Sequence, residues 1–295
     1  MSFLDDLDTI YKFDRDEKVG IVKKTAEELQ GHARKTRFAV PAKVRLALQI
    51  FVGAVVGITS IKIGYVSGLF GGVVDLGDYY AVLGDFKVYL IPLLFTVVWY
   101  VLVFNSINWS DGVPGLTSGL VVISLIVIAV STVRFYLADS TPQLRENSIF
   151  VLSILAVVLP TAAVAWYYNL APKVLLGESG SMFASFLIAS LAILVGGKVA
   201  TVATVLGVYL VDAFYVIAAR IYNGKSPLKG DRIHHLHYRL LNLGMSESFI
   251  RKFVYSISFL FGMAAVFLDR VGKMILFVIL VVVVFFVTKI LSLKK

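Results

Sequence analysis

The sequence contains no cysteine and few charged residues. Without cysteine the chain can form no disulfide, no thiolate nucleophile and no cysteine metal site. Charged residues make up 16% of the 295 residues, against an average of about 25% in soluble domains. Hydrophobic residues make up 58%, against roughly 45–50%. These proportions indicate an integral membrane protein. The N-terminal residues are acidic and contain no long apolar run, so a cleavable signal peptide is not expected.

Eight apolar stretches have the length of membrane-spanning helices. A bilayer core requires about 20 mostly apolar residues per helix, with a range near 17–25. The sequence therefore predicts an all-α fold, a polytopic membrane helix bundle of about eight transmembrane helices. The predicted spans are 44–66, 88–104, 116–137, 149–168, 182–195, 199–219, 253–268 and 274–291.

The distribution of lysine and arginine predicts the orientation of these spans, because cytoplasmic loops are enriched in both. Residues 1–43 are strongly basic and are placed inside, and the even number of spans puts both termini in the cytoplasm. The net charge of +9 is attributed to this bias rather than to nucleic-acid binding. We expect a plasma-membrane protein with a cytoplasmic segment 1–43, a bundle 44–295, and active-site loops 105–115, 169–181 and 220–252.

Four polar clusters fall on the predicted inside face, and two of them carry acids and amides. Asp5 and Asp6 are adjacent carboxylates that can act as a base or bind a cation, with a solvated acidic terminus as the alternative. Asn105, Asn108 and Asp111 follow at a spacing of three, which puts them on one helical face. Their oxygens suit Mg²⁺ that bridges substrate phosphates, whereas helix capping is the simpler role for Asp111.

The other two clusters suit phosphate groups. Residues 177–181 precede a predicted helix, where free N–H groups bind anions and Glu178 can hold a metal. A simple N-cap by Ser179 or Ser181 is an equal alternative. The loop 225–239 combines lysine, arginine and three histidines, which indicates phosphate binding. A zinc site is less well supported, because no cysteine or acidic partner stands at ligand spacing.

One further acid, Asp212, lies inside the sixth predicted span. A charge at mid-span costs about 2.5–3.5 kcal/mol on insertion scales, so Asp212 is expected to face the bundle interior beside a partner. Arg220, two turns later, is the predicted partner. A structural salt bridge and a catalytic role both remain open for Asp212.

The four clusters resemble, in order and over nearly the whole chain, the motifs of the polyprenyl-phosphate N-acetylhexosamine-1-phosphate transferases of the glycosyltransferase family 4 type. Residues 104–116 resemble the signature N-x-x-N-x-x-D-G-x-x-G-L, and residues 172–181 resemble P-A-K-x-F-x-G-D-x-G-S. Residues 223–241 resemble the loop S-P-F-K-x-D-x-x-H-L-H-H-R-L-L. Residues 3–7, followed by residues 43–49, resemble the G-x-x-D-D segment and the helix after it.

The resemblance implies an enzyme. Members of the family transfer a sugar-1-phosphate from a UDP-sugar to a polyprenyl phosphate such as undecaprenyl phosphate, with Mg²⁺ (Mn²⁺ as the alternative), and release UMP. By this resemblance, Asp5 and Asp6 would deprotonate and position the lipid phosphate, and Asp111 would be a third catalytic residue at the donor site. Asn108 and Glu178 would hold the metal. The substrate-binding residues would be Asn105, Lys229, Asp231, Arg232, His234, His235 and His237.

Three departures from the family pattern bear on this expectation. Glu178 stands where the family has aspartate, the histidine loop has one extra residue after Asp231, and Tyr238 replaces the last histidine. The chain also begins almost at the Asp-Asp motif, whereas the family has about three further helices upstream. A truncated, non-catalytic membrane homologue is therefore the alternative to an active enzyme. A transporter is a weaker third choice, because transporters bind substrate near the midplane.

The histidine loop also predicts the sugar. Its Ser-Pro-Leu-Lys lead-in, and the interruption of His234-His235 by Leu236, resemble the branch that uses UDP-N-acetylglucosamine or a similar UDP-N-acetylhexosamine. The branch that uses UDP-N-acetylmuramoyl-pentapeptide carries consecutive histidines here and remains the alternative. The expected partners are this nucleotide-sugar, the polyprenyl phosphate and membrane lipid, in cell-wall or surface-polysaccharide biosynthesis, and a homodimer is left open.

Overall fold

The computed structural model describes residues 41–59, 61–67, 72–83, 86–138, 141–170, 176–195, 199–224, 226 and 235–293. Helices make up most of these residues, which confirms the predicted all-α class. The described part of the chain holds six helices long and apolar enough to cross a membrane, or seven if one bent pair is a single span. The chain is thus a polytopic helical membrane protein. The expected count was about eight, and the orientation of the termini stays a prediction.

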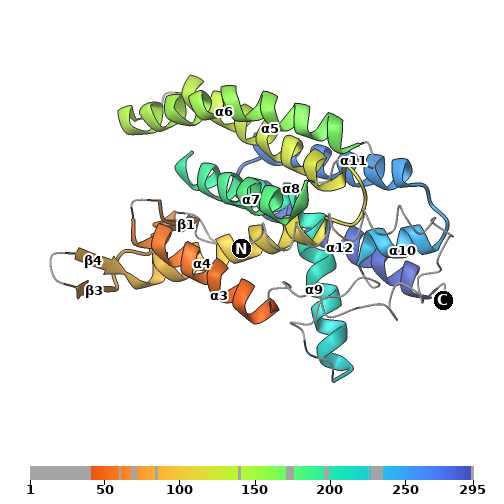
Figure 1. Cartoon of the computed structure of the whole chain (residues 1–295). Helices are drawn as coiled ribbons and strands as arrows, with labels where there is room; N and C mark the ends of the chain where they lie inside the picture. The colour runs from red at the N-terminus through yellow and green to blue at the C-terminus, as the bar shows by residue number, and fades with distance from the viewer. Residues whose placement is uncertain are drawn as a thin grey trace.

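The helices in order are as follows. Six qualify as membrane spans: α4 (Leu90–Trp109), α5 (Leu116–Leu137), α6 (Pro142–Asn169), α7 (Gly177–Leu194), α11 (Glu247–Phe267) and α12 (Arg270–Leu293). The bent pair is α8 (Val199–Val205) and α9 (Gly207–Tyr222), and the two remaining helices are α3 (Ala42–Ile58) and α10 (Leu236–Asn242). Figure 1 shows α5 and α6 lying side by side along one side of the bundle.

The first predicted span, 44–66, is wrong beyond residue 58. The helix α3 ends at Ile58, and the chain continues into two antiparallel hairpins (Figure 1). These pair β1 (Tyr65–Ser67) with β2 (Val73–Asp75), and β3 (Tyr80–Leu83) with β4 (Phe86–Tyr89). An apolar run rich in isoleucine, tyrosine and valine suits a strand as well as a helix, so hydropathy alone did not separate them.

The helices α3 and α4 pack closely because two glycines of α3 lie on the line of contact. Its buried residues are Gln49, Gly53 and Gly57, spaced by four and therefore on one face. A Cβ atom at Gly53 would lie 3.0 Å from Val97 Cα, and one at Gly57 would lie 2.8 Å from Leu93 Cδ1. Small residues at this spacing let two membrane helices approach closely. The two helices run antiparallel, so the beginning of α3 lies beside the end of α4.

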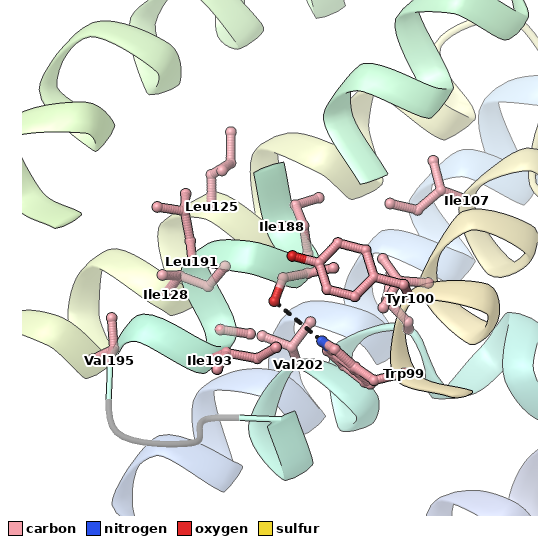
Figure 2. Packing of buried hydrophobic residues seen from close by; sticks show 14 of the residues in the cluster. Trp99, Tyr100, Ile107, Leu125, Ile128, Ile188, Leu191, Ile193, Val195 and Val202 are labelled. Atoms are coloured by element: carbon pink, nitrogen blue, oxygen red, sulfur yellow. Dashed lines mark hydrogen bonds between the residues drawn. The ribbon is translucent and has the colours of Figure 1, made fainter. Parts of the chain in front are cut away.

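Two aromatic residues fix α4 against α7 in the largest apolar cluster of the bundle (Figure 2). The indole Nε1 of Trp99 donates a hydrogen bond of 3.1 Å to the Ala189 carbonyl oxygen, and the Tyr100 hydroxyl lies 2.6 Å from Ser190 Oγ. Both aromatic side chains are buried among apolar residues, including Ile188 and Leu191. A buried indole or phenol is stabilised when its polar atom finds a partner. These contacts hold the polar end of α4 in a fixed position relative to α7.

The sixth predicted span, 199–219, is a broken helix. The axes of α8 and α9 differ by 74°, and the break falls at Leu206. Gly207 lies directly after the break, where an added Cβ would meet Leu280 Cδ2 of α12 at 2.2 Å. The close approach of α12 therefore requires glycine at this point. The break directs α9 along a different line, so that its buried acid meets the segment that begins α10.

Candidate functional site

The two asparagines of the 105–112 motif lie in the last turns of α4. Both are half-buried. Asn105 Nδ2 donates hydrogen bonds of 2.7 Å to Gln49 Oε1 on α3 and to the Val101 carbonyl oxygen. The helix continues through Asn108 to Trp109, so the two asparagines share a helical face as predicted, whereas Asp111 lies beyond the end of the helix and not on that face. The motif is thereby tied to the beginning of α3.

Asp111 lies in the turn between α4 and α5 and is exposed. Its Oδ1 accepts a hydrogen bond of 3.3 Å from Thr117 Oγ1. The N-cap residue of α5 is Gly115, which has a φ of 80° and no side-chain cap. The capping role for Asp111 is therefore wrong, and the carboxylate lies at the surface of the turn. The positive φ also explains why glycine stands at residue 115.

Glu178 lies in the first turn of α7 and not before the helix. The N-cap is Leu176, with no side-chain hydrogen bond, so the serine N-cap alternative is wrong. Ser181 Oγ instead donates a hydrogen bond of 2.9 Å to the Glu178 carbonyl oxygen. The Glu178 carboxylate accepts a hydrogen bond of 2.9 Å from Arg45 Nη1. Its side chain is only 14% exposed, so this ion pair lies partly inside the protein.

The beginning of α3 joins the two motifs. Arg45 and Gln49 are four residues apart, and their partners are Glu178 on α7 and Asn105 on α4. Sequence reasoning gave neither α3 residue a role in the site. The signal that was present is their spacing, since two polar residues four apart on an apolar helix share one face. They place the α4 motif and the α7 motif at the same end of the bundle.

His235 forms a buried pair with the acid of α9. Its Nδ1 lies 2.7 Å from Asp212 Oδ2, and Asp212 Oδ1 accepts a 3.0 Å hydrogen bond from the Leu236 N–H. The predicted Asp212–Arg220 pair is wrong, because Arg220 Nε donates to the Ser226 carbonyl oxygen. Arg220 stands about 12 Å farther along the helix, at 1.5 Å per residue. The loop that returns after α9 supplies the partner instead.

His237 is buried to 1% exposure and lies among aromatic rings. Its ring is parallel to that of His235 at 6.2 Å, and the Tyr238 and Tyr209 rings lie at 4.1 Å and 6.0 Å. Burial, with a smaller contribution from His235, lowers the pKa of His237 to about 3. Neither ring nitrogen has a hydrogen-bond partner in the described structure. His237 is therefore neutral and can contact a phosphate only as a hydrogen-bonding group, not as a cation.

The α4 motif and the histidine segment touch directly. A Cβ atom at Gly112 would lie 2.1 Å from His237 Nε2 and 3.0 Å from Tyr238 Cζ. The Trp109 indole stacks on the His235 ring, with 6.1 Å between centroids and 24° between planes. Three of the four predicted clusters thus meet around the end of α4. The fourth cluster, Asp5 and Asp6, lies outside the described residues. The same holds for four predicted residues of the histidine loop: Lys229, Asp231, Arg232 and His234.

The donor atoms at this end of the bundle fit a hard cation. Asn108 offers an amide oxygen and Glu178 a carboxylate, and Mg²⁺ takes one or two carboxylates together with water and substrate phosphates. Within the described residues no group of three or more histidines, aspartates or glutamates could hold a metal by itself. A metal here would therefore complete its coordination from phosphate oxygens and water. It would also replace Arg45 as the partner of the Glu178 carboxylate.

The fold and the polar end of the bundle define a membrane protein whose candidate site lies where its helices end. Residues 29–196, more than half of the chain, match the family described as glycosyl transferase family 4. The chain belongs to this family. The matched region includes α3, α4 and α7, and so contains Arg45, Asn105 and Glu178.

Named relatives fall into two groups. The chain is 28% identical over 257 residues to a probable undecaprenyl-phosphate N-acetylglucosaminyl 1-phosphate transferase of Bacillus subtilis, covering 84% of this chain and 65% of that protein. It is 28% identical over 178 residues to a decaprenyl-phosphate N-acetylglucosaminephosphotransferase of Mycolicibacterium smegmatis, covering 52% and 42%. It is 26% identical over 148 residues to a phospho-N-acetylmuramoyl-pentapeptide-transferase of Borrelia duttonii, covering 48% and 42%. The chain thus spans less than two thirds of each of these relatives.

Proposed function

We propose that this protein transfers N-acetylhexosamine-1-phosphate, with N-acetylglucosamine-1-phosphate as the first choice, from a UDP-sugar to a polyprenyl phosphate, and releases UMP. The observation that carries the proposal is the meeting of the 105–112 motif, Glu178 and His235 at one end of the bundle. The family and the names of the relatives point to the same chemistry.

The proposed reaction is a transfer of one phosphate together with the sugar. An oxygen of the lipid phosphate attacks the β-phosphorus of the UDP-sugar, and the bond from that phosphorus to the bridging oxygen breaks. UMP leaves with the bridging oxygen, and the lipid gains a sugar-linked diphosphate. Mg²⁺, or Mn²⁺ in its place, would be held by Asn108 and Glu178 and would neutralise the donor diphosphate. Asp5 and Asp6 would deprotonate and position the lipid phosphate, and Asp111 would contact the donor.

The position of the site suits a lipid-linked acceptor. Asn105 and Asn108 close an apolar helix of 20 residues, and Asp111 follows in an exposed turn. The phosphate of a polyprenyl chain whose tail lies in the bilayer is held at this depth, next to the water phase. The lysine and arginine bias of the sequence supports a cytoplasmic position for this end, on the side of the membrane where the nucleotide-sugar is made available.

A two-donor assay tests the function and the sugar together. The purified protein is given undecaprenyl phosphate and Mg²⁺ with either UDP-N-acetylglucosamine or UDP-N-acetylmuramoyl-pentapeptide, and lipid-linked product and UMP are measured. We expect product from the first donor, in amounts equal to UMP and dependent on the lipid. Product from the second donor alone would instead assign the chain to the muramoyl-pentapeptide reaction. No product from either donor with Mg²⁺ or Mn²⁺ would indicate a non-catalytic homologue.

A further inference from the structure

The buried acid of α9 makes two hydrogen bonds to the beginning of α10, one through each carboxylate oxygen. Asp212 Oδ2 lies 2.7 Å from His235 Nδ1, and Asp212 Oδ1 accepts the Leu236 N–H at 3.0 Å. Asp212 is fully buried and His235 is 7% exposed. His235 Nδ1 carries the hydrogen of this contact when the carboxylate is the acceptor, as it is for the Leu236 N–H.

The His235 ring has little freedom to turn. The Trp109 indole stacks on it from the end of α4, and the His237 ring lies parallel to it at 6.2 Å. Its other nitrogen, Nε2, makes no hydrogen bond to a described residue. The contacts of this ring therefore fix its plane and its Nδ1, and leave Nε2 as its one polar atom for a ligand.

We propose that Asp212 is a positioning residue that acts through His235. By holding the hydrogen on Nδ1, it keeps Nε2 as a hydrogen-bond acceptor for a hydroxyl group of a substrate. A carboxylate on one nitrogen of an imidazole sets which nitrogen carries the hydrogen and orients the ring. The ligand chemistry rests on the proposed function, whereas the state of the ring does not.

Asp212→Asn separates positioning from helix capping. The asparagine oxygen can still accept the Leu236 N–H, so α10 should keep its start and the melting temperature should stay close to that of the wild type. The asparagine NH₂ group instead donates to His235 Nδ1, and the ring hydrogen moves to Nε2. We expect kcat to fall by about 10–100-fold, as is usual when a carboxylate that orients a histidine is lost. Unchanged kcat in a folded Asp212→Asn protein would overturn the proposal.

The state of the ring can be measured without substrate. The chain has four histidines, so nitrogen-15 NMR of histidine-labelled protein gives few ring signals, and His235→Asn assigns those of His235. We expect the hydrogen on Nδ1 in the wild type and on Nε2 in Asp212→Asn. A wild-type ring with its hydrogen on Nε2 alone would overturn the proposal. If the wild type releases no UMP with either donor, the proposed function fails, and this measurement still decides the role of Asp212.

Two further variants complete the test. Asp269 Oδ1 accepts the Gly272 N–H at 2.8 Å at the start of α12, so Asp269→Asn is a matched control that should keep wild-type kcat. His235→Asn keeps a donor near Asp212 and removes the Nε2 acceptor, and it should fold and lose turnover. If Asp212→Asn does not fold, His235→Asn decides the question, and normal kcat in that variant overturns the proposal.

Discussion

The contact between Gly112 and the histidine segment gives the sharpest structural prediction. In Gly112→Ala the new methyl group would lie 2.1 Å from His237 Nε2 and 2.6 Å from His237 Cδ2, whereas real Cβ contacts essentially never fall below 3.0 Å. Gly112 does not have a positive φ, so alanine brings no backbone strain. The His237 ring is buried between Tyr209 and Tyr238 and cannot simply turn away. The α4–α5 turn and α10 must therefore move apart.

The expected cost is that of overpacking a buried contact, about 1–3 kcal/mol. For chains of 150–250 residues, each kcal/mol corresponds to a shift in melting temperature of about 2–4 °C. Gly64→Ala is the matched control, since its Cβ would meet nothing within 4 Å. That change should stay within about 0.5 kcal/mol of the wild type. UMP release should also fall in Gly112→Ala, because the two halves of the site separate.

The assay is thermal unfolding of the purified protein in one detergent, with a double-mutant cycle. His237→Ala removes the ring that the new methyl group would strike, so most of the cost of Gly112→Ala should disappear in that background, leaving only the 3.0 Å contact with Tyr238 Cζ. The reasoning would be refuted by a Gly112→Ala protein that melts with the wild type. It would equally be refuted by a cost that is as large after the His237 ring is removed as before.

Three further predictions test the metal ligand, the orientation and the buried histidine. Glu178→Gln should abolish Mg²⁺-dependent UMP release. The control is Glu247→Gln, which alters the ion pair of the exposed Glu247 with Arg251 and should leave UMP release unchanged. Near-normal turnover of Glu178→Gln at saturating Mg²⁺ would show that Glu178 is not a metal ligand. The chain has no cysteine of its own, so single cysteines can report its orientation. A cysteine at the exposed Gln143 should react with an impermeant reagent added outside intact cells, and one at the exposed Asn223 should not. The reverse pattern would place the candidate site on the outer side of the membrane. Because burial lowers the pKa of His237 to about 3, below about 6.5 for an unfolded chain, the unfolded state binds the proton first, and stability should fall as the pH drops from about 6.5 toward 3. His237→Gln should lose this part of the pH dependence in thermal unfolding, and equal slopes for both proteins would contradict the assignment.

The motifs of the sequence come together in the structure, whereas several predicted helix boundaries are wrong. Asn105, Asn108 and Asp111 were expected on one helical face; the two asparagines lie in the last turns of α4, and Asp111 lies in the turn that follows. The meeting of the 105–112 motif with the histidine segment was expected only through the resemblance and the one-sided placement of the clusters. The contact itself is formed by Gly112, which has no side chain, packing against the His237 ring. No local pattern reveals that contact, because the two residues are joined only by the fold.

The misplaced elements share a physical cause. Hydropathy measures how apolar a segment is and not how its backbone turns, so α3 and the first hairpin were merged into one span. At the break, Leu280 of α12 approaches the backbone of Gly207 closely, and this long-range contact leaves no local pattern in the sequence. The wrong partner for Asp212 has the same origin. Arg220 was the cation nearest in sequence on that helix, whereas His235 is brought to Asp212 by the returning loop.

The central claim is that a sugar leaves the nucleotide together with one phosphate. The most direct measurement supplies UDP-N-acetylglucosamine labelled with phosphorus-32 only in the β-phosphate, together with undecaprenyl phosphate and Mg²⁺, and follows the label into the lipid fraction. Transfer of a sugar-1-phosphate predicts that the label moves to the lipid in the same amount as unlabelled UMP appears. Label that stays in the water phase as UDP, while the sugar reaches the lipid, would contradict the account.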